Sequence, residues 1–153
     1  MKKLLFVIEH IQGGGAERVI CELSLALGKN YDVALVVFEN RETNYVHCSN
    51  YISLEIPGSS KGLKKVVNLF RRIKALRKIK RVNCIDVSIS FMSNANVVNV
   101  LSGVTCNICS IRTVLSAVRP DKIARKVEKY ILSRADKVVT LSKSVEKDLI
   151  ECF

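Results

Sequence analysis

The residues best suited to chemistry lie in a glycine-rich segment near the start of the chain. Gly13, Gly14 and Gly15 follow the apolar run 4–8 and precede the amphipathic segment 16–27. Glycines between a buried strand and a helix let backbone N–H groups approach an anion closely, and the helix dipole favours negative charge there. The segment therefore predicts a phosphate-binding turn. The alternative is a tight turn whose glycines serve only the backbone.

Two familiar phosphate loops do not match this turn. Glu17 and Arg18 stand where a Walker loop requires Lys followed by Ser or Thr. The turn also lacks the last glycine of the Gly-x-Gly-x-x-Gly dinucleotide fingerprint, although Glu39 follows the second apolar run and could bind a ribose. These departures weaken a nicotinamide-dependent oxidoreductase as an interpretation and leave it as an alternative.

Strand-like and helix-like segments alternate along the chain and would position this turn. Apolar runs predict strands at 4–8, 32–38, 51–56, 85–91, 106–111 and 137–141. Helical spacing predicts helices at 16–27, 62–82, 94–101, 121–134 and from 143 onward. The alternation indicates an α/β fold, a Rossmann-like, doubly wound and mostly parallel sheet with helices on both faces. Ligands of such folds bind at the carboxyl ends of the strands, where the glycine turn would lie.

Length and composition indicate one ordinary globular domain. The chain has 153 residues, of which 48% are hydrophobic and 25% charged, and no apolar run approaches the ~20 residues of a membrane span. We therefore expect a cytoplasmic protein. Cys106 and Cys109 have the spacing of a redox pair, but in a strand residues three apart point to opposite faces. The six cysteines are expected to be buried thiols that bind no metal.

The predicted helix 62–82 is strongly basic. The net charge is +11, and no Asp or Glu occurs between Glu55 and Asp86. Apolar residues keep helical spacing along it and are expected to pack on the sheet: Leu63, Val66, Val67, Phe70, Ile73, Leu76 and Ile79. The residues expected on the exposed face are Lys64, Lys65, Arg71, Arg72, Lys78 and Arg81.

This basic face predicts docking on an anionic membrane surface, and a merely solvated helix is the alternative. Nucleic acid is not an expected partner, because no aromatic residues are interleaved for base stacking apart from Phe70. A basic binding module without chemistry remains an alternative function.

Five segments together resemble the retaining family-four glycosyltransferases of the GT-B fold. They are 13–19, which reads Gly-Gly-Gly-Ala-Glu-Arg-Val, and 85–91, 94–96, 110–113 and 133–142. The resemblance implies that the chain is the N-terminal, acceptor-side domain and that a C-terminal donor-binding domain is absent. On its own the chain would then be inactive.

The resemblance also implies a function. Such a hexosyltransferase moves a sugar from a nucleotide-sugar to a glycan or lipid-linked acceptor, here in cell-surface polysaccharide or lipopolysaccharide biosynthesis at the cytoplasmic face of the membrane. The nucleotide-sugar is a co-substrate, and no cofactor or metal is expected. Gly14 and Gly15 would approach the donor diphosphate. Acceptor-side candidates are Glu17, Arg18, Asn94, Asn96 and Arg112.

Two qualifications apply to these candidates. Family members frequently carry a carboxylate or His where this chain has Ile111, so no catalytic residue is assigned. Glu17 and the two asparagines also have simpler interpretations, as residues that complement or cap a helix start.

Overall fold

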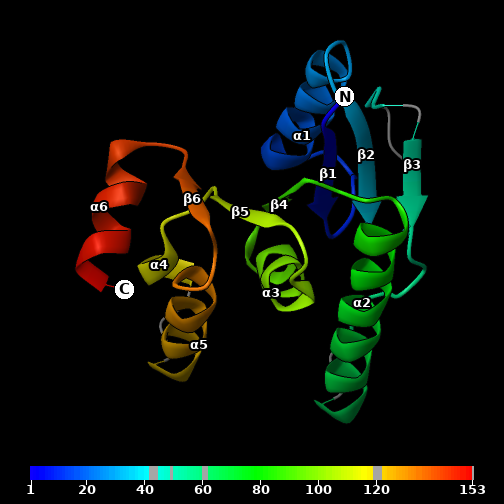
Figure 1. Ribbon diagram of the computed structural model, residues 1–153. Coiled ribbons are helices and arrows are strands. Elements are labelled where there is room, and N and C mark those ends of the chain that lie inside the picture. Colours follow the sequence, from blue (N-terminus) through cyan, green and yellow to red (C-terminus); the bar gives the residue numbers. More distant parts are fainter. Residues whose placement is uncertain (42–44, 49, 60–61, 119–121, 153) are drawn as a thin grey trace.

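The computed structural model describes the chain except for residues 42–44, 49, 60–61, 119–121 and 153. Six parallel strands form one sheet in the order β3-β2-β1-β4-β5-β6 (Figure 1). Their bounds are β1 Lys3–Ile8, β2 Asp32–Val37, β3 Asn50–Ser53, β4 Val87–Phe91, β5 Cys106–Ile111 and β6 Lys137–Thr140. The predicted Rossmann-like α/β fold is confirmed.

β1 lies at the centre of the sheet because its side chains are apolar on both faces. Phe6 pairs with Leu35 on one side and Ile89 on the other, and it is fully buried. Leu4, Phe6 and Ile8 belong to one hydrophobic core, whereas Leu5 and Val7 belong to a second. A strand with side chains in two cores is apolar at consecutive positions, and the sequence of β1 shows this pattern.

Helices cover both faces of the sheet, as predicted. The helices are α1 Gly15–Leu27, α2 Gly62–Val82, α3 Ser93–Ser102, α4 Leu115–Val118, α5 Lys122–Leu132 and α6 Lys143–Cys152. Ile20 of α1 packs in the core that contains Phe6, and Leu76 of α2 packs in the core that contains Val7. α3 contacts both α2 and α5, so these three helices form one layer. The sequence did not predict α4.

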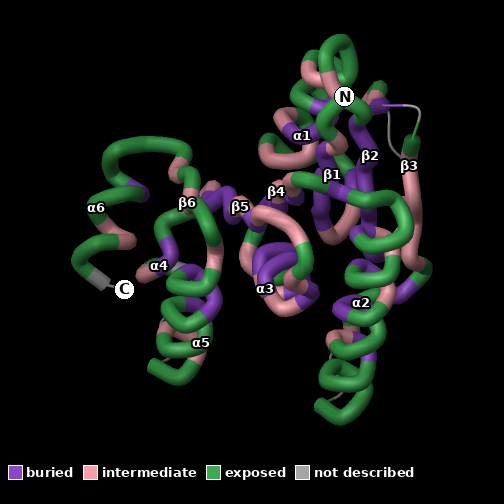
Figure 2. Tube along the Cα trace, viewed as in Figure 1, coloured by how far each residue is buried: buried purple, intermediate pink, exposed green. Residues whose placement is uncertain are grey.

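The apolar face of α2 agrees with the prediction only in the second half of the helix. Leu63 is 83% exposed and Phe70 67%, and Val66 and Val67 are each about half exposed. Ile73 and Leu76, in the second half of the helix, are buried against the sheet as predicted. The physical reason is visible in Figures 1 and 2, where the first half of α2 projects past the end of the strands and remains exposed. Helical spacing identifies an apolar face but not how far the sheet extends beneath it.

Three of the six cysteines match the expectation of buried thiols. Cys21, Cys48 and Cys109 are buried and free, but Cys84 is exposed, contrary to the prediction. Burial raises the pKa of the Cys109 thiol to about 11. Cys106 is half exposed, and the side chain of Cys152 lies outside the described residues.

A buried lysine joins α2 to the neighbouring elements. The Lys80 ammonium is inaccessible to solvent and donates to Asn107 Oδ1 at 2.7 Å, to the Asn99 carbonyl at 3.0 Å and to the Gly103 carbonyl at 3.2 Å. Ser88 donates to the side-chain oxygens of both asparagines, which extends the network to β4. All of these acceptors are neutral, so burial dominates and lowers the pKa of Lys80 to about 7.

Stability should therefore rise with pH just above neutrality. The folded-state pKa of Lys80 is about 7, below its ordinary value of 10.5, so the unfolded chain binds more protons between these two values. We expect the free energy of unfolding to increase between pH 7 and 8.5 by up to about 1.4 kcal/mol per pH unit. Urea denaturation at the two pH values measures the slope, and Lys80→Met should remove this increase. Equal slopes in both proteins would contradict a titrating Lys80.

Candidate functional site

The candidate site is a cavity of about 150 Å³ at the carboxyl ends of β1, β4 and β5. Parallel strands bring these ends to one edge of the sheet, so residues far apart in sequence meet there. Its lining residues are Glu9, Met92, Ser93, Asn94, Asn96, Ser110, Ile111, Arg112, Thr113 and Leu115. The cavity thus combines two of the five segments that pointed to a glycosyltransferase, 94–96 and 110–113.

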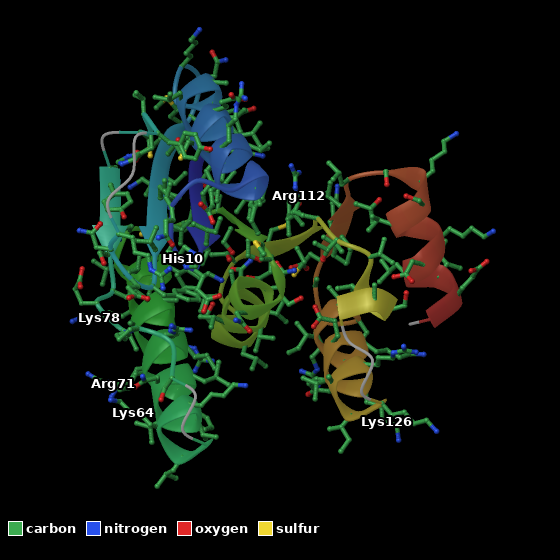
Figure 3. The ribbon with its side chains drawn as sticks, turned by 180° about the vertical axis from the view of Figure 1, so that it is seen from behind. His10, Lys64, Arg71, Lys78, Arg112 and Lys126 are labelled. Atoms are coloured by element: carbon green, nitrogen blue, oxygen red, sulfur yellow. The ribbon has the colours of Figure 1, made fainter. Side chains whose placement is uncertain are left out.

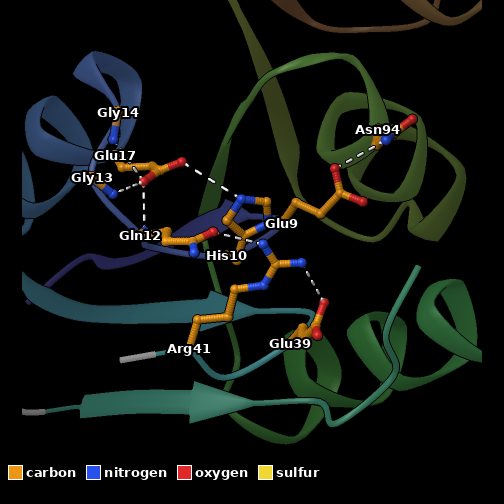
Figure 4. A network of polar contacts seen from close by, with 9 residues as sticks. All are labelled: Glu9, His10, Gln12, Gly13, Gly14, Glu17, Glu39, Arg41 and Asn94. Atoms are coloured by element: carbon orange, nitrogen blue, oxygen red, sulfur yellow. Dashed lines mark hydrogen bonds and ion pairs between the residues drawn. The ribbon is translucent and has the colours of Figure 1, made fainter. Parts of the chain in front are cut away.

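The glycine turn next to this cavity already holds a carboxylate. Glu17 Oε2 accepts hydrogen bonds from the backbone N–H groups of Gln12 at 2.6 Å, Gly13 at 2.5 Å and Gly14 at 2.9 Å (Figure 4). Glu17 Oε1 lies 3.7 Å from His10 Nε2. Of the N–H groups expected to face a donor phosphate, that of Gly14 therefore already donates to the first turn of α1, as does that of Gly13.

The electrostatics of Glu17 follow from this arrangement. Partial burial acts to raise the pKa of the carboxyl group, but the three backbone N–H groups and the His10 ring outweigh it, and the pKa is lowered. The backbone N–H groups of the turn bind an anion, as its composition predicts. That anion is the Glu17 carboxylate of the same chain. That the turn also contacts a donor phosphate stays a prediction.

Only one of the three glycines in the turn has a backbone conformation that disfavours other residues. Gly13 has φ of +153°, whereas Gly14 has φ of −86° as the residue that precedes α1. A Cβ atom on Gly14 would meet Glu17 Oε1 at 3.4 Å, and one on Gly15 would meet nothing within 4 Å. Backbone strain on substitution is thus expected at Gly13.

Glu9 and Asn94 form a polar pair across the opening of the cavity. Asn94 Nδ2 donates to Glu9 Oε2 at 3.0 Å, which joins the end of β1 to the start of α3 (Figure 4). Glu9 Oε1 lies 3.6 Å from Arg72 Nη1. Asn94 was a predicted acceptor-side residue, whereas Glu9 was not predicted. Its position directly after the first buried strand could have indicated a place at the site, because ligands bind at strand ends.

Arg72 is the one membrane-surface candidate that the structure contradicts. It is only 7% exposed, its Nε donates to the Ile56 carbonyl at 2.9 Å, and its guanidinium lies 4.5 Å from the centre of the Phe38 ring. Arg72 lies on the face of α2 that points toward the sheet, where it braces Glu9. A long side chain that reaches a strand end across the core is not visible in a helical spacing pattern.

The remaining acceptor-side candidates lie in different places. Arg112 lines the cavity with its guanidinium 5.5 Å from the centre of the Phe91 ring, and no carboxylate of the described residues lies within ion-pair distance. Asn96 is buried and bonds to Ser90 and to the Ser110 carbonyl, which is a structural role. Arg18 is exposed on α1 and pairs with Glu22 at 2.8 Å.

Met92 is a feature of the site that sequence patterns do not predict. It directly follows β4, lines the cavity and has φ of +75°, which is rare for a residue with a side chain. Such conformations persist where surrounding structure enforces them, and they gather at binding sites. The Met92 N–H donates to the Ser110 carbonyl at 3.4 Å, which extends the pairing of β4 with β5 by one residue.

The carboxylate proposed for a nicotinamide cofactor is already paired. Arg41 donates to Glu39 Oε2 at 3.0 Å and to Gln12 Oε1 at 2.7 Å (Figure 4). This pairing ties the end of β2 to the glycine turn. Within the described residues, no three His, Cys, Asp or Glu side chains come together as a metal site.

The other basic candidates on α2 are exposed, as predicted. Lys64, Arg71 and Lys78 point outward from the side of the helix that faces away from α5 (Figure 3), and Lys65 and Arg81 are also exposed. None of the described helices is both long and apolar enough to span a membrane.

Comparison with known proteins agrees with this fold. In fold, the chain is similar to UDP-N-acetylglucosamine 2-epimerase from Rickettsia bellii, with a TM-score of 0.69 at 14% identity over 99% of the chain. It is also similar to a lipopolysaccharide outer-core galactosyltransferase in its apo form, with a TM-score of 0.61 at 13% identity over 98% of the chain. The chain covers 42% of each of these GT-B-type proteins. The fold is therefore the Rossmann-like half of a GT-B architecture.

The chain belongs to Glycosyltransferase Family 4, which matches residues 13–153. A relative in Campylobacter jejuni is 33% identical over 100 residues, which are 63% of this chain and 28% of the relative. That relative is a GalNAc-α-(1→4)-GalNAc-α-(1→3)-diNAcBac-PP-undecaprenol α-1,4-N-acetyl-D-galactosaminyltransferase. The chain thus spans less than half the length of the proteins it resembles.

Glu17 should stabilise the turn through its charge. Glu17→Ala removes the acceptor of three backbone N–H groups and is expected to lower the free energy of unfolding by about 1–2 kcal/mol at pH 7. Urea denaturation measures this loss, and Glu22→Ala, which removes an exposed carboxylate of the same helix, is the control, with a change under about 0.5 kcal/mol.

The pH dependence gives a second readout for Glu17. Its folded-state pKa is lowered, so the stability it contributes is present above its unfolded pKa and is lost as the pH falls through the folded value. The difference between wild type and Glu17→Gln should therefore shrink below pH 4.5. If the difference in free energy of unfolding between the two proteins did not change with pH, the charge of Glu17 would not contribute to stability.

Proposed function

We propose that this chain is the acceptor-side domain of a retaining hexosyltransferase. The enzyme would transfer a sugar from a nucleotide-sugar to a glycan or lipid-linked acceptor in cell-surface polysaccharide or lipopolysaccharide biosynthesis. The observation that carries the proposal is the cavity at the carboxyl ends of the strands, which Glu9, Asn94 and Arg112 line. The chain that forms it belongs to Glycosyltransferase Family 4. The Campylobacter relative, whose name gives a lipid-linked glycan as its acceptor, supports the acceptor class.

The side chains of the cavity suit a saccharide that carries an anionic group. Glu9 accepts and Asn94 both donates and accepts, so together they match sugar hydroxyls, which do both. Arg112 lines the same cavity and could bind a phosphate or carboxylate through paired N–H groups. Bracing by Arg72 fixes the Glu9 carboxylate in advance, which lowers the entropic cost of binding.

The donor would be held mainly by a second domain. In this scheme Gly13, Gly14 and Gly15 approach the donor diphosphate across the interdomain cleft, and the phosphate must either displace Glu17 or use the N–H of Gly15. Transfer then requires both domains, because the reacting atoms must be held within attack distance of each other.

The isolated chain should therefore bind acceptor-like ligands and not donors. Calorimetry with uridine- and guanosine-diphosphate sugars should show no micromolar binding, and no transfer should occur. NMR titration with hexose 1-phosphates should shift signals of the cavity residues. Arg112→Ala should weaken this binding about tenfold or more through the loss of a charge-assisted hydrogen bond, whereas Arg18→Ala should leave it unchanged. Micromolar donor affinity would place the donor site on this domain instead.

Attachment to the cytoplasmic face of the membrane is part of the proposal. The support is the basic face of α2, where Lys64, Lys65, Arg71, Lys78 and Arg81 are exposed and no acidic residue occurs within the helix. Each such residue near an anionic surface contributes about 1 kcal/mol of attraction. A lipid-linked acceptor would make this attachment useful.

Charge removal should release the protein from anionic vesicles. A triple variant, Lys64→Gln, Arg71→Gln and Lys78→Gln, is expected to lose most of its binding in vesicle co-sedimentation at physiological salt. The control neutralises three exposed lysines outside α2, namely Lys137, Lys143 and Lys147. Both variants should keep the wild-type thermal midpoint, since exposed charges contribute little to stability. If both variants lost the same amount of vesicle binding, the attraction would depend on the net charge of the protein and not on α2.

A further inference from the structure

A second cavity adjoins the candidate site and shares two of its side chains. It lies between α2, α3 and α5, the three helices that form one layer (Figure 1), and we call it the helix cavity. Its volume of about 450 Å³ is within the range of small-molecule sites. Glu9 and Asn94 line both the helix cavity and the cavity at the strand ends. A ligand in the first cavity can therefore continue into the second.

One side chain that lines the helix cavity has a polar group without a partner. The Arg72 Nε donates to the Ile56 carbonyl, and its Nη1 lies 3.6 Å from Glu9 Oε1. Its Nη2 is buried and has no hydrogen-bond partner among the described residues. A buried donor without an acceptor costs free energy, so native structures leave few of them. An oxygen atom of a bound ligand would supply the missing acceptor.

The formal charges around the helix cavity cancel. Two carboxylates, Glu9 and Glu128, and two cations, Lys65 and Arg72, line it. An anionic ligand would have to compete with Glu9 for Arg72, because these two already form an ion pair. Most of the other lining residues are apolar, namely Pro57, Leu69, Val97, Val98, Ala124 and Val127. The helix cavity therefore suits an uncharged ligand that has both a polar and an apolar part.

We propose that the helix cavity binds an N-acylamino group, such as acetamido, on the second sugar of the acceptor, next to the sugar that receives the transfer. The inference rests on the proposed function and deepens it, because it states which class of glycan the site accepts. An acetamido group has one N–H donor and one carbonyl acceptor, as a peptide unit has, and also a methyl group. Its carbonyl accepts from Arg72 Nη2, its N–H donates to the Glu9 carboxylate, and its methyl group packs on the apolar side chains.

A hydroxyl group at the same position would use only part of this arrangement. It can accept from Arg72 or donate to Glu9, but it leaves the apolar side chains in contact with water. The acetamido group pairs with both residues and also covers these side chains. Because the ion pair with Glu9 holds Arg72 in place beforehand, little conformational entropy is lost on binding. A sugar with an acetamido group should therefore bind about tenfold more tightly than the same sugar with a hydroxyl group.

NMR titration of the chain with two matched pairs of sugars measures this preference. N-acetylglucosamine is compared with glucose, and N-acetylgalactosamine with galactose, so the members of each pair differ only at carbon 2. In at least one pair, we expect the acetamido sugar to have a dissociation constant about tenfold lower and to shift the signals of Val97 and Ala124, which line the helix cavity. Saturation-transfer difference spectra should be strongest at its methyl protons, because these contact apolar side chains.

Two variants separate the polar from the apolar contact. Arg72→Lys keeps a positive charge near Glu9 but removes Nη2, and it should abolish the preference for the acetamido sugar. Ala124→Leu places a larger side chain in the helix cavity and should weaken binding of the acetamido sugar about tenfold. It tests the proposal even if Arg72→Lys does not fold. Ala26→Leu makes the same change on the exposed surface of α1 and should bind as the wild type does.

Three results would overturn the proposal: equal affinities within both pairs of sugars, no binding of either acetamido sugar, or a preference that Ala124→Leu leaves intact. The proposed function would survive each of them, provided that hexose 1-phosphates still bind at the strand ends and that Arg112→Ala weakens this binding. If hexose 1-phosphates did not bind but the acetamido sugars did, the proposed function would be wrong and the helix cavity would still be a site for N-acylamino groups.

Discussion

The central position of β1 is the constraint on which the rest of the structure depends. Because β1 is apolar on both faces and pairs with β2 and β4, every other element is arranged around it. Its carboxyl end can carry polar residues only where the sheet stops, and Glu9, His10 and the glycine turn follow there. The same sheet edge receives the ends of β4 and β5, so the site results from strand direction and not from any local motif.

The fold was largely predictable because its signals are strong and local. The two central strands β1 and β2 are apolar at every residue after the first. The bounds of α2 agree with the prediction from its spacing and composition. β3 is short and half exposed, so its pattern overestimated its length. α4 has only four residues, too few for helical periodicity to be recognised.

The site was less predictable because its contacts join distant parts of the chain. Glu9 directly follows β1, Arg72 lies on α2 and Asn94 on α3. Only the three-dimensional arrangement shows that the arginine points inward. The strain at Met92 has no signature in sequence. The glycine turn was recognised as an anion site, yet its composition could not show that Glu17 of the same segment would occupy it. The family resemblance identified the class of enzyme more reliably than any single residue.

The carboxylate in the glycine turn has a consequence for the order of events. The Glu17 carboxylate is tethered to the turn and competes for its N–H groups at an effective concentration in the millimolar range or above. A free phosphate in solution therefore binds there less readily. A phosphate that is itself held by a second domain becomes tethered too, and that disadvantage disappears. Glu17 would thus make the turn respond to closure of the two domains on each other and not to the concentration of loose anions in the cell.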